Sequence, residues 1–339
     1  MNTRAVYQGG GRIAIDQTPD PVPGPGEVLL TPRFTGICGS DLHALHGSFD
    51  DRLELPAVMG HETVGRLAAV GPGVEGWTIG ERATVLTAIG CGVCSACEEG
   101  HTNICVRVRI LGIEAPGSLQ EKWVVPADQL VRVPDSIPDR HAALIEPLAV
   151  AVHDVARAEL RGGEDVAIIG AGPVGVLVAL VARTAGAQVV LADINEARLE
   201  IARSLGLESV AAAEIEAHVF TRAKDGFRVS FEVTGVAAGL DASVAVLRPR
   251  GRIILVGVHP GLRSVDMSRV FRRELELRGA RMHTREDYER AIELLESGAV
   301  DVEPLISHVF PLEETDRAFS ALADAPDAMK VLIDSRPER

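Results

Sequence analysis

Four cysteines that lie close together in the sequence predict a metal site. Cys91, Cys94, Cys97 and Cys105 follow the spacing Cys-x2-Cys-x2-Cys-x7-Cys. Thiolates at such spacing in a loop can surround one zinc ion, and four protein ligands leave no open coordination position. A bacterial iron–sulfur run has a last gap of three residues followed by proline, whereas here the gap is seven and Val106 follows. We therefore expect a structural zinc.

The fifth cysteine indicates a second metal site less directly. Cys38 lies in the segment Gly-Ile-Cys-Gly-Ser-Asp-Leu-His, and His61 follows later in Gly-His-Glu. Glu146 is a lone carboxylate among apolar residues, and a buried carboxylate needs a partner such as a cation. Cysteine and histidine can hold a catalytic zinc, but they are also common core residues. The residues alone leave both interpretations open.

A glycine-rich segment predicts a dinucleotide site. The sequence Gly-Ala-Gly-Pro-Val-Gly at 170–175 follows an apolar strand and opens a helix, so backbone N–H groups and the positive helix end can bind a pyrophosphate. Asp193 ends the next predicted strand, near the spacing expected for a carboxylate that binds ribose hydroxyls. Because a carboxylate repels a 2′-phosphate, NAD is favoured over NADP. Arg198 could instead accommodate that phosphate or be an ordinary exposed helix residue.

The surrounding pattern predicts the elements that carry these motifs. After Leu160, helix-length segments alternate with apolar runs, which indicates a doubly wound parallel α/β sheet. Asn195 should cap a helix over 196–205, and Thr284 should begin an amphipathic helix that ends near Ser297. The first 140 or so residues, rich in glycine, proline and valine, read as a β-rich domain with long loops. The six expected strands are 166–169, 189–192, 209–211, 229–233, 253–256 and 275–277.

Composition narrows the class of protein. A length of 339 residues suggests two domains, and 46% hydrophobic with 24% charged residues is typical of globular chains. A formal net charge of −14 argues against binding to nucleic acid or to anionic membranes. The first residues lack the apolar core of a signal peptide, and an odd, clustered set of five cysteines favours metal ligation over disulfides. We expect a cytoplasmic protein.

Together these motifs make the chain resemble the zinc-containing medium-chain dehydrogenases of the alcohol dehydrogenase superfamily, most closely the polyol (sorbitol-type) and threonine dehydrogenase branch. The motif Gly-His-Glu-x2-Gly-x5-Gly-x2-Val, which begins at Gly60, is specific to that family. The resemblance implies a GroES-like catalytic domain at 1–147 with a zinc lobe at about 91–105. It further implies a Rossmann NAD-binding domain at 148–282 and a return to the catalytic domain at 283–339.

The resemblance also implies roles at the catalytic zinc. Cys38 and His61 would ligate the metal, with Glu62 and Glu146 as ligands or exchangeable ligands and Glu62 also catalytic. In the classical alcohol dehydrogenase branch a cysteine stands at the position of Glu146, so this chain departs from that branch and sides with the polyol-like one.

Two further residues would move the substrate proton, and a third would reach the cofactor. Ser40 would hydrogen-bond the substrate oxygen, and His43 would end a relay through the nicotinamide ribose to solvent. Lys330, by its matching position, would reach the cofactor pyrophosphate, although a solvated surface position is an equal interpretation. The cofactor contacts expected are Gly170, Gly172, Pro173, Val174, Gly175, Asp193, Arg198, Val256 and Lys330.

The expected activity is the zinc- and NAD-dependent oxidation of a secondary alcohol to a ketone by hydride transfer. Two zinc ions per chain are expected, and zinc would act as a Lewis acid. The substrate classes favoured are a polyol, sugar, cyclitol or diol, with L-threonine as the first alternative. A non-catalytic nucleotide-binding protein of the same fold is the second. The partners expected are a small alcohol or ketone and further copies of the chain, as a dimer or tetramer.

Overall fold

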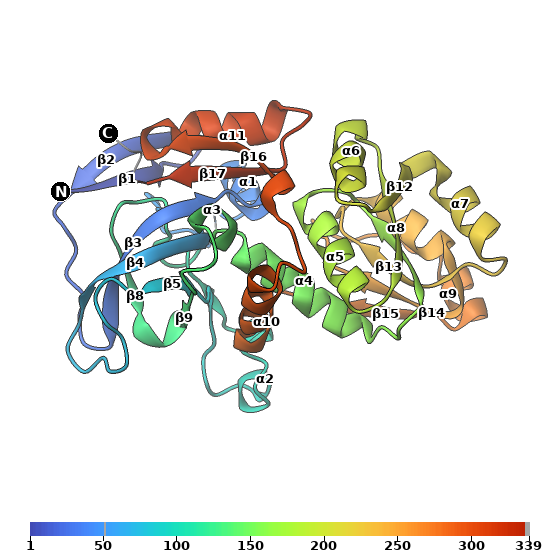
Figure 1. The fold of residues 1–339 in the computed structure, drawn as a ribbon, viewed down its shortest axis with the longest axis horizontal. Coiled ribbons are helices and arrows are strands. Elements are labelled where there is room, and N and C mark those ends of the chain that lie inside the picture. Colours follow the sequence, from blue (N-terminus) through green and yellow to red (C-terminus); the bar gives the residue numbers. More distant parts are fainter. Residues whose placement is uncertain (51, 336–339) are drawn as a thin grey trace. The chain divides into compact units, whose positions relative to one another are not determined.

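Short β-strands dominate the first of two units into which the computed structural model divides (Figure 1). The structure describes residues 1–50 and 52–335. The first unit comprises residues 1–146, 283–298 and the chain from 306 onward. Its strands are β1 (Asn2–Tyr7), β2 (Ile13–Thr18), β3 (Glu27–Gly36), β4 (Glu62–Val70), β5 (Arg82–Val85), β6 (Ala88–Ile89), β7 (Arg109–Ile110), β8 (Trp123–Pro126), β9 (Leu130–Arg132), β16 (Ile306–Pro311) and β17 (Lys330–Asp334). Its helices are α1 (Gly39–Leu45), α2 (Ser95–Glu98), α3 (Asp139–Ala142), α10 (Arg285–Glu296) and α11 (Thr315–Asp324).

The long strand β3 organises the sheet of this unit. The strand order is β16-β17-β3-β4-β5-β9, β8 pairs with β3, and the pairs other than β16 with β17 are antiparallel. Alternate side chains of β3 face a core with Trp123 and Val125 of β8. The predicted β-rich domain is therefore confirmed, and its residues near the end of β3 are the ones that carry chemistry.

The C-terminal return completes this sheet. β17 pairs antiparallel with the end of β3, so Ile333 lies opposite Thr35. The predicted helix is confirmed as α10, because the Thr284 hydroxyl accepts from the Asp287 N–H and the Asp287 carboxylate accepts from the Thr284 N–H.

The second unit comprises residues 147–282 and 299–305. The helix α4 (Ile145–Ala158) begins with the last residues of the first unit and continues into it. Residues 299–305, which the sequence placed with the catalytic domain, group here because the short turn at 303–305 contacts α6. Its strands are β10 (Asp165–Ile169), β11 (Gln188–Asp193), β12 (Glu208–Ala211), β13 (Phe227–Glu232), β14 (Leu247–Leu255) and β15 (Glu276–Gly279). Its further helices are α5 (Pro173–Thr184), α6 (Glu196–Ser204), α7 (Ile215–Arg222), α8 (Ala237–Ala245) and α9 (Met267–Arg273).

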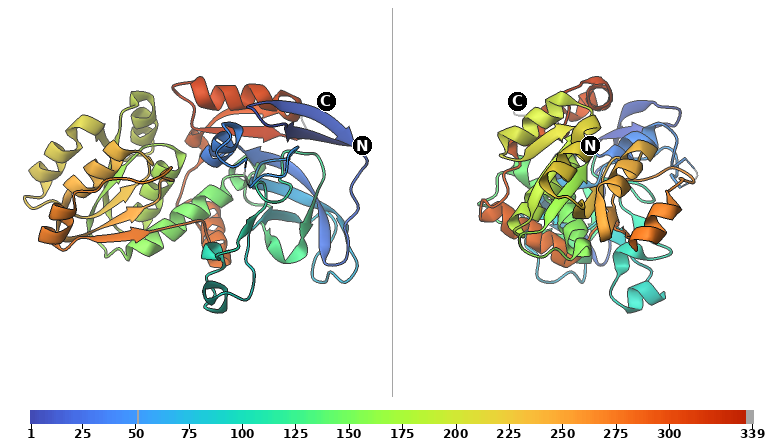
Figure 2. Two further views of the ribbon diagram at one scale, coloured as in Figure 1. Left: turned by 180° about the vertical axis from the view of Figure 1, so that it is seen from behind. Right: turned by 90° about the vertical axis from the view of Figure 1, so that its right-hand side faces the viewer.

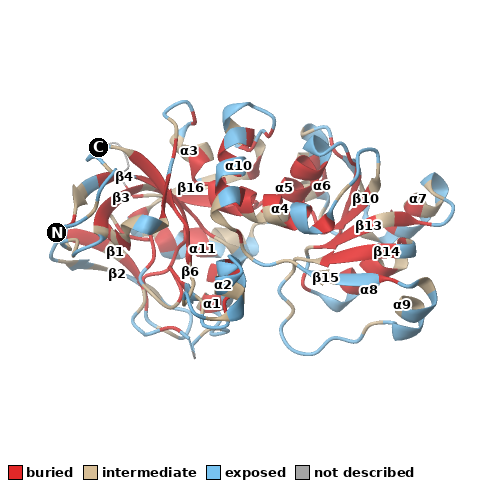
Figure 3. Ribbon diagram, turned by 90° about the horizontal axis from the view of Figure 1, so that it is seen from below, coloured by how far each residue is buried: buried red, intermediate tan, exposed pale blue. Residues whose placement is uncertain are grey.

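The doubly wound sheet predicted from the alternating pattern is confirmed. Its strands are parallel and run in the order β12-β11-β10-β13-β14-β15. Helices lie on both sides of the sheet (Figure 2), and the strands between them are largely buried (Figure 3). The strand order reverses direction between β10 and β13, which is where such sheets bind ligands. Within the described part of the chain, no helix is long and apolar enough to span a lipid bilayer.

Candidate active site and zinc sites

Three predicted ligands meet in the first unit. The ligand atoms of Cys38, His61 and Glu62 all lie within 4.8 Å of one another. Cys38 precedes α1, whereas His61 and Glu62 lie at the start of β4. Pairing of β3 with β4 places Glu62 opposite Gly36, two residues before Cys38, which brings the segments together. We call these three residues the Cys–His–Glu group.

Two glycines make room for this group. A Cβ atom on Gly36 would collide with the Glu62 carboxylate, so the facing position on β3 accepts no side chain. Gly60 has a φ of 93°, and a Cβ atom there would lie 2.8 Å from Leu119. The Gly-His-Glu motif therefore sets the backbone conformation that presents His61 and Glu62.

Asp41 orients His61 and was given no role by sequence analysis. Its Oδ1 lies 3.5 Å from His61 Nδ1, and its Oδ2 accepts the Cys38 N–H at 2.9 Å. Burial lowers the pKa of His61, but Asp41 and Cys38 outweigh burial and hold that pKa well above the usual range. Metal-ligating histidines commonly pair with a carboxylate in this way. An aspartate at the third position of the helix after Cys38 is the sequence feature that could have indicated this contact with His61.

Glu62 has one paired and one unpaired oxygen. Its Oε1 accepts from Lys330 Nζ at 2.7 Å, whereas Oε2 is buried without a hydrogen-bond partner among the described residues. Lys330 is only 3% exposed and also donates to the Ile37 carbonyl at 3.3 Å. Burial lowers the pKa of Lys330, but Glu62, Cys38 and Glu146 raise it more, so this side chain stays an ammonium. A buried, unpaired carboxylate oxygen beside a thiol and an imidazole fits a zinc ion.

The position of Lys330 corrects one expectation. A solvated surface lysine is excluded, because the ammonium is buried against Glu62 and the end of β3. Its predicted contact with the cofactor pyrophosphate stays a prediction, and the carboxylate of Glu62 is the partner that the first unit provides.

Glu146 lies outside the Cys–His–Glu group. Among the described residues its carboxylate is not part of the set that lies within 4.8 Å. Instead Oε1 accepts from His283 Nε2 at 3.0 Å. Burial raises the pKa of Glu146, but His283, His61 and Lys330 lower it more, so the group is a carboxylate. His283, which sequence analysis missed, follows Glu146 by 137 positions, so no local pattern connects them.

The predicted relay residues both lie on α1. The Ser40 hydroxyl is 3.4 Å from His61 Nε2, so it faces the Cys–His–Glu group. His43 lies three residues further along the helix and is exposed to solvent. Residues three apart share a helix face, so the pair can connect the group with solvent. Their roles in proton transfer stay predictions.

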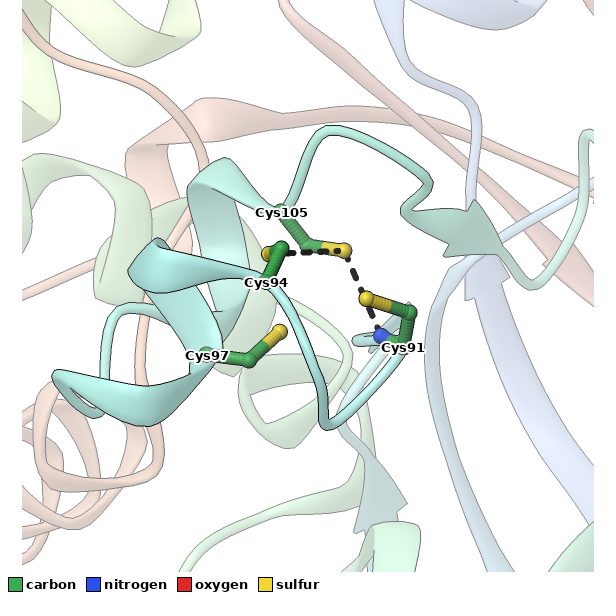
Figure 4. Close-up of side chains that lie close together, drawn as sticks. All are labelled: Cys91, Cys94, Cys97 and Cys105. Carbon is green, nitrogen blue, oxygen red and sulfur yellow. Dashed lines mark hydrogen bonds between the residues drawn. The ribbon is translucent and has the colours of Figure 1, made fainter.

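The four cysteines surround one space. Their sulfur atoms lie within 4.8 Å of one another, on a loop that includes the short helix α2 (Figure 4). The Cys105 sulfur accepts from the backbone N–H of Cys91 and of Arg107, each at 3.3 Å. A set of four thiols fits a closed zinc site.

The glycine-rich loop of the second unit has the geometry expected of a dinucleotide site. Gly170 follows the last residue of β10 and has a φ of 111°, and a Cβ atom on Gly175 would collide with the Gly170 carbonyl. Gly172 caps α5 with Pro173 at the first helical position, and a Cβ atom there would meet only the Arg198 guanidinium, at 3.9 Å. Backbone N–H groups and a cation therefore face the space in front of α5.

Asp193 is hydrogen-bonded to the backbone of this loop. Its Oδ2 accepts the Ala171 N–H at 2.6 Å, and its Oδ1 accepts the Asn195 N–H at 2.8 Å. Asn195 caps α6 by accepting from Ala197 and Arg198, as the sequence indicated. Each Asp193 oxygen retains a lone pair that a ribose hydroxyl can use. Contacts of Val174 and Val256 with a cofactor stay predictions.

A second buried cluster at the same edge of the sheet escaped sequence analysis. Glu232, the last residue of β13, accepts N–H groups of Thr234 and Gly235 and the Nε2–H of His259 at 2.8 Å. Gly257 is required there because a Cβ atom would collide with the Gly235 backbone. The cluster ties the turn after β13 to the turn after β14.

The chain is similar to known proteins over most of its length. Residues 24–135 match the family model for the alcohol dehydrogenase GroES-like domain, and residues 173–297 match the model for zinc-binding dehydrogenases. A 2-dehydro-3-deoxy-L-galactonate 5-dehydrogenase of Pseudoalteromonas atlantica is 40% identical over 94% of each chain. An L-threonine 3-dehydrogenase of Aeromonas salmonicida is 34% identical over 94% of this chain and 95% of the relative.

A solved structure is similar over nearly the whole chain. It is a zinc-binding dehydrogenase of Sinorhizobium meliloti bound to NADP, with 30% identity, a TM-score of 0.92 and coverage of 98% of this chain and 99% of that one. The chain therefore belongs to the zinc-containing medium-chain family of alcohol dehydrogenases. It is an enzyme of the alcohol or polyol dehydrogenase type, which uses zinc, a nicotinamide cofactor and a small-molecule substrate. The non-catalytic alternative is set aside.

Proposed function

We propose that the protein oxidises a secondary alcohol of a polyol, sugar or sugar acid to a ketone, with NAD as the hydride acceptor. The Cys–His–Glu group with its unpaired Glu62 oxygen carries the proposal, because such a site demands a cation. Zinc bound there supplies Lewis acidity, and the nicotinamide ring accepts the hydride. Two zinc ions per chain follow from the two groups of ligands.

The residues of the chain hold the reactants and move the proton. The Ser40 hydroxyl, next to His61, accepts the proton from the substrate alcohol and passes it toward His43 at the solvent side of α1. Asp41 keeps His61 in one orientation and disfavours its loss from the metal. Lys330 holds Glu62 through Oε1, which leaves Oε2 as the oxygen that would bind zinc.

The substrate class rests on the relatives and on the carboxylates. The 40% identical relative acts, by its name, on a dehydro-deoxy sugar acid, which supports a polyhydroxylated substrate. The relatives named for L-threonine are less similar but cover the chain as fully, so L-threonine is the second candidate. An L-threonine dehydrogenase must bind an ammonium group, whereas a polyol or sugar acid offers further hydroxyls.

NAD is proposed over NADP because of Asp193. Its carboxylate lies beside the helix start of α5, where it would repel a 2′-phosphate. Arg198, on α6, reaches toward the same loop and supports ribose or phosphate binding alike. The S. meliloti relative bound NADP, so the choice needs a direct measurement.

A substrate panel tests the proposed function. Polyols, diols, inositols, deoxy sugar acids and L-threonine are offered with NAD and with NADP, and formation of the reduced cofactor is followed by absorbance. We expect turnover of a polyhydroxylated compound with NAD and none after His61→Ala. Turnover of L-threonine alone would favour the second candidate. Metal analysis that finds fewer than two zinc ions per chain would contradict the pair of metal sites.

We also propose that the protein assembles as a homo-oligomer in the cytoplasm. β15 is the edge strand of its sheet, and the neighbouring apolar side chains of Leu262, Met267 and Phe271 are 101%, 65% and 82% exposed. An open strand edge beside exposed apolar side chains is typical of a surface that a second copy covers. The free thiols of the four-cysteine site favour a reducing compartment.

A further inference from the structure

His283 is a buried histidine next to, but outside, the Cys–His–Glu group. It is 1% exposed and lies just before α10, whose first turn is fixed by the Thr284 and Asp287 caps. Its Nε2 lies 3.0 Å from Glu146 Oε1 and 3.4 Å from the Thr87 hydroxyl oxygen. All of these residues belong to the first unit.

The surroundings of His283 fix its ring and its tautomer. The imidazole packs edge-on against Tyr288, with ring centroids 4.7 Å apart, and the Tyr288 hydroxyl donates to the Val85 carbonyl at 2.9 Å. A carboxylate can only accept, so Nε2 carries the proton that is donated to Glu146. Nδ1 is buried without a hydrogen-bond partner among the described residues, so the hydrogen bond from Nε2 is the one that orients the ring.

His283 therefore determines which partner Glu146 binds. A buried carboxylate must be paired, and the structure pairs Glu146 with the His283 N–H, while the charges of His61 and Lys330 also act on it. A cation bound by the Cys–His–Glu group would be a competing partner. In this structure the hydrogen bond to His283 is made and Glu146 stands apart from that group. Without the donor on His283, the carboxylate would be left to bind the metal.

We propose that His283 is a positioning residue that holds Glu146 away from the metal, so that one coordination position stays free for the substrate oxygen. The proposal rests on the zinc site of the proposed function. A protein that supplied Cys38, His61, Glu62 and Glu146 together would close the site with four ligands, which is the arrangement of structural zinc. His283 prevents that closure by binding Glu146.

Cobalt replacement with imidazole as a probe tests this role. Co²⁺ in the Cys–His–Glu group gives visible bands that report its coordination, and an open position lets imidazole bind and shift them. The four-cysteine site has no open position and should not respond. His283→Leu and His283→Phe remove the donor, whereas His283→Gln keeps an N–H donor on a side chain of similar reach. Both donor-free variants are made so that the measurement can be done on at least one variant that folds.

We expect the donor-free variants to bind imidazole about tenfold more weakly than wild type and to show altered cobalt bands before imidazole is added. His283→Gln should resemble wild type. In a Glu146→Gln background the same substitutions should have no further effect, because the competing carboxylate is gone. A purely structural histidine would instead lower thermal stability while leaving the imidazole affinity unchanged.

Two results would overturn the proposal. One is an unchanged imidazole affinity and unchanged cobalt bands in the folded donor-free variant, and the other is an equal loss in the wild-type and Glu146→Gln backgrounds. If the wild-type protein binds no cobalt through Cys38, that result contradicts the proposed function itself. There would then be no metal site whose open position His283 could keep free.

Discussion

Asp193 is proposed to select the cofactor, and the backbone orients its carboxylate. The Ala171 and Asn195 N–H groups each bind one of its oxygens, so the side chain cannot rotate to make room for a phosphate. Discrimination then depends on charge and on the remaining lone pairs, both of which belong to this one residue.

Asp193→Ser should weaken NAD binding by about tenfold or more and narrow the preference over NADP, since hydrogen bonds to a charged group are lost together with the repulsion. The measurement is kcat/KM for the two cofactors. Glu200→Ser, which removes an exposed carboxylate from α6, serves as the control and should change neither value. A wild-type enzyme that already prefers NADP would refute the assignment of Asp193.

His43 and Ser40 differ in how directly they would touch the reacting alcohol. Ser40 faces His61, whereas His43 is exposed at the end of α1. A group that acts through solvent can be bypassed, and a group that contacts the substrate oxygen cannot.

His43→Ala should therefore slow kcat at neutral pH by up to about 10²-fold, the low end for general acid–base groups, and approach wild type at high pH, where hydroxide replaces it. Ser40→Ala should cost more at neutral pH, and His61→Ala should abolish turnover at every pH. The test is kcat against pH with the best substrate, with the neighbouring exposed His46→Ala as control. Equal losses for His43→Ala at neutral and high pH would make that histidine structural.

The loop from Cys91 to Cys105 has few buried residues, among them Asn103 and Cys105. It contains the single turn α2 and a 3-10 turn at 102–104, with no buried residue in α2. The N–H of Val93 and the Arg107 guanidinium lower the pKa of Cys91 to about 6, whereas burial and the neighbouring thiols raise that of Cys97 to about 11. Between pH 7 and 9 Cys91 is thus a thiolate and Cys97 keeps its proton.

Zinc binding to this loop should therefore strengthen as pH rises. Zinc must displace the proton of Cys97, so release of that proton should raise the apparent zinc affinity by about tenfold per pH unit. Cys91 has already lost its proton in this pH range and should add little to the pH dependence. Chelator competition between pH 7 and 9, in a His61→Ala background that leaves only this site, measures it. Cys97→Ser should lower both zinc content, by about one per chain, and thermal stability. An affinity independent of pH would show that Cys97 is not a ligand.

The second unit leaves one edge of its sheet open. β15 pairs with β14 on one side, and among the described residues no strand pairs on its other side. The same unit also exposes apolar side chains on α9 and on the loop before it. Water contact with exposed apolar surface is unfavourable, so the proposed association of two copies would be stabilised by the hydrophobic effect.

Phe271→Glu should accordingly shift the protein to a smaller species, because it places a charge in the proposed interface. Sedimentation velocity at several concentrations measures the change. Val22→Glu, which alters an equally exposed apolar residue of the first unit, is the control and should leave the mass unchanged. A wild-type mass equal to one chain would exclude the oligomer.

Much of this structure could be predicted from residues that lie close together in the sequence. The strands of the parallel sheet, the Asn195 and Thr284 caps, and the Gly170 to Asp193 spacing depend on residues within about twenty positions, where backbone geometry and periodicity act directly. The four cysteines were likewise found from spacing, because their loop closes on itself.

Contacts between segments that are far apart in the sequence could not be predicted in this way. Glu62 and Lys330 are separated by 268 positions, and Glu146 and His283 by 137. The pairing of β17 with β3 brings the first pair together, and the docking of α10 beside Val85 brings the second. Buried charges need partners, so the tertiary fold decided which carboxylate lies with Cys38 and His61 and which one binds His283.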